Sequence, residues 1–169
     1  KVESGLYSVS YYKPEEVVRY AFDGQYAWPK NLFMLDRCFL VQKYLLLSGD
    51  TLLIVNTHNT AYDDGGIRRL QMEQLKQWLL DKASSGHRII VGGDWNQIPD
   101  GIDPEQFGTK TQNTAFQVVK VPDGFLPKGW HWAYDSSRPT NRSLNTPYSD
   151  SSYQNVLDYF LVSPGLEII

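Results

Sequence analysis

The sequence predicts a mixed α/β domain, on the evidence of three successive patterns. Two β-prone apolar runs are joined by a short turn, an amphipathic helix follows, and a buried strand comes directly after the helix. This order, with hairpin-like strands at the sides, is typical of mixed α/β proteins. The 169 residues are enough for one domain with a core, and 41% of them are hydrophobic and 14% aromatic.

The first half of the chain predicts a hairpin and then a helix. Residues 38–47 and 51–57 are apolar, and Ser48-Gly49-Asp50 between them is a turn sequence. A helix is expected over residues 67–83, and Ser84-Ser85-Gly86 is expected to end it. Its buried face is predicted to hold Ile67, Leu70, Leu75, Trp78 and Leu79, and its solvent face Arg68, Arg69, Glu73 and Lys76.

Further strands are expected downstream of the helix. Residues 88–91 predict a short buried strand, 114–121 and 130–134 predict two more, and 155–163 predict a final one. The alternating aromatic residues in 130–134 favour a core strand over a wall that stacks against a base or sugar.

Charge and cysteine content narrow the function classes. The net charge of −3 argues against a dedicated DNA-binding domain, although a nuclease need not be basic overall. Cys38 is the only cysteine, which excludes an internal disulfide or a thiolate metal cluster and indicates a packing role.

The sequence contains neither a signal peptide nor an apolar run long enough to span a bilayer. The chain begins at Lys1 and stops on apolar residues at Ile169, so we expect residues 1–169 to be one partial domain. The compartment stays open, and a secreted or periplasmic protein whose upstream signal was removed is among the alternatives.

The first polar motif is Asn56-Thr57-His58-Asn59, at the end of an apolar strand. A side chain there points into the crevice in which α/β sheets bind ligands, so His58 could donate a hydrogen bond to a phosphate oxygen. For a lone histidine, satisfaction by a neighbouring backbone group is the favoured alternative.

The second motif is Gly92-Gly93-Asp94-Trp95-Asn96. The two glycines are expected to let the backbone turn sharply, and an extended backbone would aim Asp94 and Asn96 at the same side. A carboxylate and a carboxamide at one point can orient a water and contact a phosphoryl oxygen. An ordinary turn rich in Asn and Asp is an equal alternative.

The third motif is Asp158 among the apolar residues 156–162. Burying a carboxylate is unfavourable unless it is paired or hydrogen-bonded, so the flanking residues predict a partner for Asp158. The alternative is an aspartate at a strand end that faces solvent.

These three motifs in this order, with Arg68, Gln71 and Leu75 on the helix between the first two, resemble the endonuclease/exonuclease/phosphatase superfamily. The resemblance covers most of the chain. It implies an α/β (α+β) sandwich like that of pancreatic deoxyribonuclease, with two mixed β-sheets packed face to face and flanked by helices. It also implies hydrolysis of a phosphate ester by water, assisted by Mg²⁺ or by Mn²⁺ or Ca²⁺.

The resemblance also implies residue roles. His58 would bind the scissile phosphate, Asp94 would orient or deprotonate the attacking water and could bind the metal, and Asn96 would hold a phosphoryl oxygen. Asp158 would fix the tautomer of a catalytic histidine in a later Ser-Asp-His segment, whereas His87 and His131 do not lie in such a segment.

The family pattern also has parts that this sequence lacks. A metal-binding Glu is expected upstream of Lys1, so we expect the parent protein to be an enzyme and this chain to have little activity alone. Asn59 stands where the family usually has leucine.

Substrate contacts are expected from Asn59 and from the polar loop at 138–148, through Arg138, Asn141 and Arg142. A solvated surface loop is the favoured alternative for that segment. Nucleic acid, a phospholipid head group and a sugar or inositol phosphate stay open as substrates, and nothing indicates an obligate protein partner. A degenerate domain that uses the same fold for binding is the competing function class.

Overall fold

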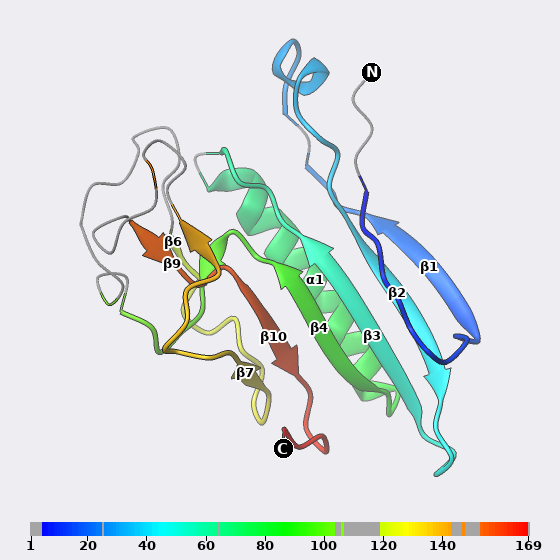
Figure 1. The fold of residues 1–169 in the computed structure, drawn as a ribbon. Helices are drawn as coiled ribbons and strands as arrows, with labels where there is room; N and C mark the ends of the chain where they lie inside the picture. The colour runs from blue at the N-terminus through cyan, green and yellow to red at the C-terminus, as the bar shows by residue number, and fades with distance from the viewer. Residues whose placement is uncertain are drawn as a thin grey trace.

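The structure, a computed structural model, describes residues 5–24, 26–63, 65–103, 106, 119–142, 147 and 153–168. Its centre is a six-stranded mixed sheet in the order β1-β2-β3-β4-β10-β7 (Figure 1). The strands are β1 (Glu16–Ala21), β2 (Cys38–Leu45), β3 (Thr51–His58), β4 (Arg88–Asp94), β7 (His131–Ala133) and β10 (Asp158–Val162). β3 and β4 are parallel, and the other neighbouring strands are antiparallel.

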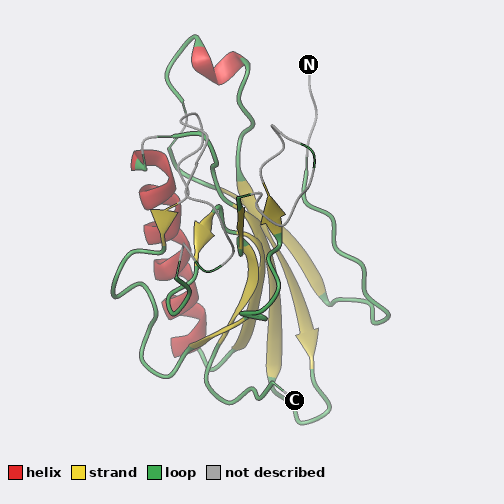
Figure 2. Cartoon of the chain, turned by 60° about the vertical axis from the view of Figure 1, so that its left-hand side comes forward, coloured by secondary structure: helices red, strands yellow, loops and turns green. Residues whose placement is uncertain are grey.

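One face of this sheet is covered by α1 (Gly66–Ser84), which connects β3 to β4 (Figure 2). A short 3-10 helix, η1 (Lys30–Leu32), precedes β2. The remaining strands form two small ladders, β5 (Gln97–Ile98) with β6 (Val119–Lys120) and β8 (Asn141–Arg142) with β9 (Gln154–Asn155). The predicted α/β (α+β) class, with a multi-strand mixed sheet, is confirmed. No helix among the described residues is long and apolar enough to cross a membrane.

Most of the predicted elements form close to their expected bounds. The turn at Ser48-Gly49-Asp50 joins β2 to β3 as an antiparallel hairpin, and Gly49 has the positive φ of 88° that glycine tolerates. The final strand was expected over residues 155–163. The observed strand, β10, is shorter and begins at Asp158. Of the strand predicted at 114–121, residues 119–120 form β6, and 114–118 lie outside the described residues.

The predicted buried face of α1 was wrong in part. Leu70 is 45% exposed, whereas the side chains buried along α1 are Arg68, Gln71, Met72, Leu75 and Leu79. The difference has a polar cause, because Arg68 and Gln71 bond to the loops that follow β3 and β4. The helix therefore presents these polar groups at its first turns and apolar groups further along.

Aromatic packing fills the core at two places. Between the sheet and α1, Tyr20 stacks on Phe39 at 5.0 Å between ring centroids, and both rings meet Trp78. Beside β10, Trp95 stacks on Tyr159 at 5.5 Å and meets Trp132 edge-on. Trp130 is buried in the core, and Trp132 and Tyr134 pack against it, as the alternation in residues 130–134 predicted.

The glycine pair in β4 allows close packing and does not turn the chain, which corrects the sequence-based expectation. Gly92 and Gly93 both lie within the strand. A Cβ atom on Gly92 would collide with the ring of Phe160, and one on Gly93, whose φ is 144°, would collide with the Thr57 carbonyl. The turn comes three residues after Gly93, at Asn96, where φ is 51°.

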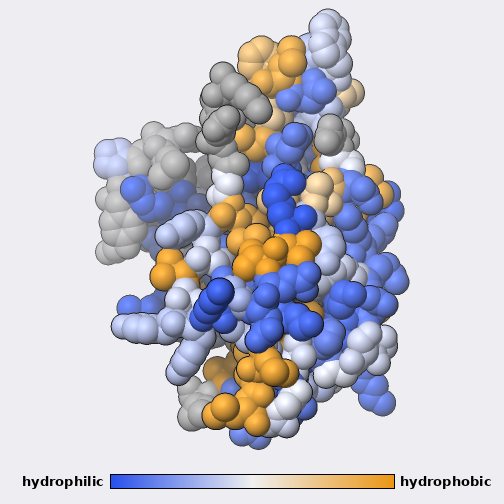
Figure 3. All heavy atoms as spheres, turned by 90° about the vertical axis from the view of Figure 1, so that its right-hand side faces the viewer, coloured by the Kyte–Doolittle hydropathy of each residue, from blue (hydrophilic) through white to orange (hydrophobic). Residues whose placement is uncertain are grey.

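The sheet face that points away from α1 carries the chain's N-terminal segment. Asn56 donates from Nδ2 to the Tyr7 carbonyl at 3.1 Å and to Ser8 Oγ at 3.3 Å, which ties that segment to β3. Apolar patches lie among polar atoms on the side of the molecule where β1 is located (Figure 3). Exposed apolar side chains near this edge are Val9, Val17, Leu45 and Leu47.

Candidate active site at the strand ends

Three of the predicted catalytic side chains lie in a row across three adjacent strands. His58 ends β3, Asp94 ends β4, and Asp158 begins β10. In the sheet register His58 pairs with Asp94, and Asp94 pairs with Asp158. Residues directly opposite one another share a face of a sheet, so these side chains gather at one edge, the upper one in Figure 1. We call His58, Asp94 and Asp158 the strand-end cluster.

The closest contact in the cluster joins His58 to Asp94. His58 Nε2 lies 3.6 Å from Asp94 Oδ2, and the two side chains are 40% and 31% exposed. Both groups are therefore half-buried yet open to a ligand. His58 is therefore not enclosed in the protein interior.

Asp158 is exposed, which corrects the expectation of a buried carboxylate. Its neighbours Leu157 and Tyr159 are buried, so the alternation along β10 turns the Asp158 side chain outward. A residue that was not predicted, Thr140, holds this position. Thr140 Oγ1 accepts hydrogen bonds from the backbone N–H groups of Leu157 at 2.9 Å and Asp158 at 3.0 Å. The only signal for Thr140 was its place in the polar loop before the final strand.

Asn96 lies beneath the strand-end cluster and organises the loop after β4. Its side chain is buried, and its Nδ2 donates to the Asn59 carbonyl at 2.8 Å. Its backbone N–H donates to Asp94 Oδ1 at 2.9 Å. The expected alternation of Asp94 and Asn96 fails because the strand ends at Asp94 and Asn96 adopts a positive φ.

The Asn59 side chain does not reach the surface. It is fully buried, accepts a hydrogen bond from the Thr57 hydroxyl at 2.9 Å and donates to Met72 Sδ at 3.1 Å. This location corrects its assignment as a substrate contact. Asn59 instead fixes the backbone to which Asn96 bonds.

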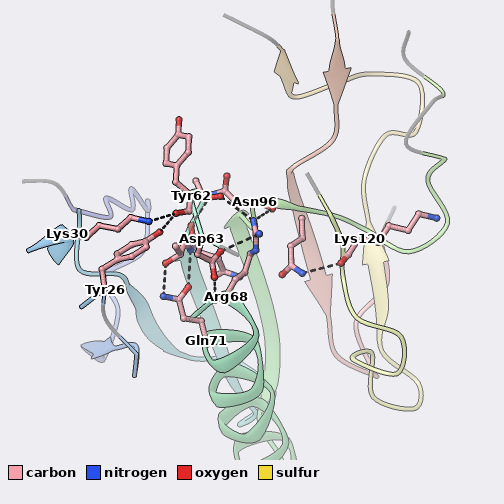
Figure 4. Close-up of polar contacts among 12 residues, drawn as sticks. Tyr26, Lys30, Tyr62, Asp63, Arg68, Gln71, Asn96 and Lys120 are labelled. Carbon is pink, nitrogen blue, oxygen red and sulfur yellow. Dashed lines mark hydrogen bonds and ion pairs between the residues drawn. The ribbon is translucent and has the colours of Figure 1, made fainter. Parts of the chain in front are cut away.

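A buried ion pair supports this loop from below. Arg68 donates from Nη1 to the Asn96 carbonyl at 2.9 Å, and its Nη2 lies 3.3 Å from Asp63 Oδ1 (Figure 4). Asp63 Oδ2 also accepts a hydrogen bond from the Arg68 backbone N–H at 3.0 Å. Both side chains of the pair are only 2% exposed. This role was not predicted, because the helical periodicity indicated that Arg68 faces solvent.

The loop residues predicted as substrate contacts lie on either side of Thr140, Arg138 before β8 and Asn141 and Arg142 within it. Arg138 is exposed, and its Nε is 3.5 Å from Asp135 Oδ2. Asn141 and Arg142 form β8, which pairs with β9 just before the start of β10. Residues 143–146 and 148 of the predicted loop lie outside the described residues.

Burial sets the protonation of the strand-end cluster. It raises the pKa of Asp94, opposed by the hydrogen bond from the Asn96 N–H and by the charge of Arg37. The packing around its strand also desolvates Asp158 in part, although the side chain is exposed, and this raises its pKa. The hydrogen bond of Thr140 opposes that shift, and the charge of Asp94 reinforces it. Burial and then Arg37 lower the pKa of His58, while Asp158 raises it. The imidazole is therefore neutral at neutral pH.

The raised carboxyl pKa values predict a pH effect on stability. Between the unfolded pKa of about 3.9 and the raised folded pKa, the folded state holds protons that the unfolded chain has released. Stability contributed by Asp94 therefore falls as pH rises through this window. The Asn side chain of Asp94→Asn does not titrate. With EDTA present, the free energy of unfolding of this variant should therefore increase relative to that of the unmodified protein as the pH rises from about 3.5 to 7. Urea unfolding at a series of pH values measures this, and a relative loss would contradict it.

The described residues fit only part of a metal site. Asp94 and Asp158 are adjacent carboxylates that repel each other, an arrangement that a divalent cation would stabilise. Among the residues that the structure describes, no three His, Cys, Asp or Glu side chains gather closely enough to hold a metal ion. A hard cation takes about six oxygen ligands, so these carboxylates alone do not complete its coordination.

The sequence profile of the Endonuclease/Exonuclease/phosphatase family matches residues 8–169. The chain belongs to this family. No individual curated protein matches the chain in sequence. The strand-end positions of His58, Asp94 and Asp158 thus lie within the matched region.

Solved structures share the fold of this family member. The human Nocturnin catalytic domain with bound sulfate has a TM-score of 0.50 at 18% identity, over 89% of this chain and 48% of that one. TDP2 from D. rerio, complexed with a single-stranded DNA product, has a TM-score of 0.51 at 17% identity, over 90% and 54%. The mannosyl-6-phosphatase Bt3783 of Bacteroides thetaiotaomicron has a TM-score of 0.53 at 15% identity, over 90% and 53%. The chain therefore spans about half the length of these structures.

Proposed function

We propose that this chain belongs to a Mg²⁺-dependent phosphoesterase that hydrolyses a phosphate ester with an activated water. The observation that carries the proposal is the row of His58, Asp94 and Asp158 at one edge of the sheet. Family membership supports phosphoester hydrolysis in general. The roles of individual residues rest on the geometry and electrostatics of the strand-end cluster.

In this proposal each member of the cluster has a distinct task. Neutral His58 donates a hydrogen bond to a phosphoryl oxygen, because burial and Arg37 lower its pKa. Asp94 orients the attacking water and accepts its proton, and its raised pKa brings it closer to the working pH of a general base. Asn96 keeps the Asp94 carboxylate in place through its backbone N–H. Asp158 orients a catalytic histidine.

Mg²⁺ would supply charge stabilisation to the phosphoryl group in the transition state. Asp94 is the carboxylate of the strand-end cluster that would contribute to holding it. Mn²⁺ or Ca²⁺ are hard cations of the same kind. A domain that keeps the fold for binding alone is the competing function, and the same experiment separates the two.

The substrate is proposed at the level of a phosphate ester. TDP2 from D. rerio was solved with a single-stranded DNA product, and Bt3783 is a mannosyl-6-phosphatase. These two neighbours are consistent with nucleic acid or a sugar phosphate as the substrate. Inositol phosphates and phospholipid head groups are the other candidate substrates. The net charge of −3 does not favour tight binding of duplex DNA.

Hydrolysis of a substrate panel with and without metal tests this function. The panel holds single-stranded and plasmid DNA, a choline phospholipid, a sugar phosphate and an inositol phosphate. We expect turnover on at least one substrate with Mg²⁺ and a loss of about 10²-fold or more in EDTA, restored when Mg²⁺ is added back. Circular dichroism confirms that the protein stays folded in EDTA. A folded protein that hydrolyses none of these substrates would favour the binding domain.

A further inference from the structure

A cavity of about 160 Å³ lies directly beside His58. Its lining includes three charged side chains, Arg19, Asp36 and Arg37, together with His58. Gly5 and Leu6 of the N-terminal segment also line it, and Asn56 ties that segment to β3 through Tyr7 and Ser8. We call this space the arginine cavity.

Arg19 reaches this cavity from β1. Its neighbour Tyr20 stacks on Phe39 and meets Trp78 of α1, so alternation along the strand directs Arg19 to the opposite face of the sheet. In the register Arg19 pairs with Leu40, and Leu40 pairs with Asn56, which is two residues before His58 on β3. The guanidinium therefore lies on the same face as His58, toward the β1 edge.

Arg37 lies between Arg19 and the strand-end cluster. Its carbonyl accepts a hydrogen bond from the Phe22 N–H at 3.0 Å, which fixes its backbone just before β2. Its charge acts on both Asp94 and His58. Burial lowers the pKa of Arg37, and Asp94 is the largest opposing influence. A half-buried guanidinium of this kind favours an anion as its partner.

The cavity has an excess of positive charge in an acidic protein. Two arginines line it against one carboxylate, Asp36. Within the described part of the chain, neither Arg19 nor Arg37 forms an ion pair with a carboxylate. These guanidinium groups are therefore available to a ligand. Guanidinium groups suit the geometry of phosphate, which they bind through two parallel hydrogen bonds.

We propose that the arginine cavity is an anion subsite that binds a second phosphoryl group of the substrate. This inference rests on the proposed function, in which the ester to be hydrolysed lies at the strand-end cluster. A water occupies about 30 Å³, so a cavity of about 160 Å³ has room for the oxygens of one phosphoryl group. The preferred substrates then carry two phosphoryl groups, either on one small molecule or on neighbouring nucleotides of a strand.

Titration of the metal-free protein with inorganic phosphate in EDTA tests the site without any reaction. Isothermal titration calorimetry should show binding that weakens about 10-fold in Arg37→Met and in Arg19→Met. Arg37→Lys should lie between, since lysine keeps the charge and loses the planar fork. Arg69→Met on the exposed side of α1 is the matched control and should bind like the unmodified protein. Equal affinity in all of these proteins would overturn the proposal.

A kinetic comparison then identifies the source of the second phosphoryl group. One pair of substrates is an inositol monophosphate and bisphosphate, and the other is a dinucleotide without and with a 5′-phosphate. Arg19→Met should lower kcat/KM about 10-fold more for the doubly phosphorylated member of one pair than for its partner. Equal losses within both pairs would overturn the subsite.

The two tests fail in different ways. Arginine-dependent binding of phosphate without hydrolysis of any substrate would preserve the anion site and contradict the proposed function. Hydrolysis with unaltered phosphate binding in both arginine variants would preserve the function and contradict the anion site.

Discussion

Replacing Asp94 with Asn is expected to lower kcat/KM for phosphate-ester hydrolysis by about 10²- to 10⁴-fold. The substitution keeps the size of the side chain and its acceptor for the Asn96 N–H, but removes the base that takes the proton from water. Asp94 Oδ2 lies 3.6 Å from His58 Nε2, within the strand-end cluster. Steady-state kinetics with the best substrate of the panel and saturating Mg²⁺ measures the loss.

A matched control separates this effect from a general change in charge. Asp123→Asn removes one carboxylate from an exposed turn beside Lys76 of α1 and should leave kcat/KM within about 2-fold. Circular dichroism should show the same fold in both variants. Residual activity of Asp94→Asn within about 5-fold of the unmodified protein would exclude Asp94 as the base.

The largest expected change in stability comes from Arg68→Met. This substitution removes the partner of Asp63, whose side chain is 2% exposed, and leaves a buried carboxylate uncompensated. Such a loss lowers the free energy of unfolding by about 3–5 kcal/mol. The variant also loses the hydrogen bond to the Asn96 carbonyl, so the loop below Asp94 should loosen. Urea unfolding followed by tryptophan fluorescence measures the change.

The neighbouring residue provides the control for this stability effect. Arg69 is 67% exposed and pairs with Glu73 on the surface of α1, so Arg69→Met should change stability by less than about 0.5 kcal/mol. The double variant Asp63→Leu/Arg68→Met should be more stable than Arg68→Met alone, because no unpaired charge is left. A double variant that is less stable than Arg68→Met would contradict this account.

The elements that the sequence predicted well are those that local patterns determine. The hairpin follows from two apolar runs around Ser48-Gly49-Asp50, and the end of α1 follows from Gly86, which adopts a φ of 83°. The order of His58, Asp94 and Asp158 was also visible, since each lies at the boundary of an apolar strand. The parallel pairing of β3 with β4 then places His58 beside Asp94.

The expectations that failed depend on partners distant in the sequence. Arg68 is buried because the Asn96 carbonyl, 28 residues away, accepts its hydrogen bond. Thr140 holds Asp158 from 18 residues away, and no spacing in the sequence signals that contact. Arg37 approaches Asp94 only through the pairing of β2, β3 and β4. Register and tertiary contact, rather than local propensity, decide these positions.

The cluster and the loop beneath it act as one unit in this account. Arg68 holds the Asn96 carbonyl, the Asn96 N–H holds Asp94, and Asp94 lies beside His58. A substitution beneath the surface should therefore reduce activity as well as stability, and Arg68→Met should lower kcat at temperatures where it is still folded.

Hydrolysis in water enriched in oxygen-18 tests the central claim most directly. Attack of an activated water on phosphorus places one labelled oxygen in the phosphate-bearing product for each bond cleaved. Mass spectrometry of the products should find the label there with Mg²⁺ present, and Asp94→Asn should form the labelled product at least about 10²-fold more slowly. Label in the alcohol product, or labelled phosphate formed equally well by Asp94→Asn, would contradict the account.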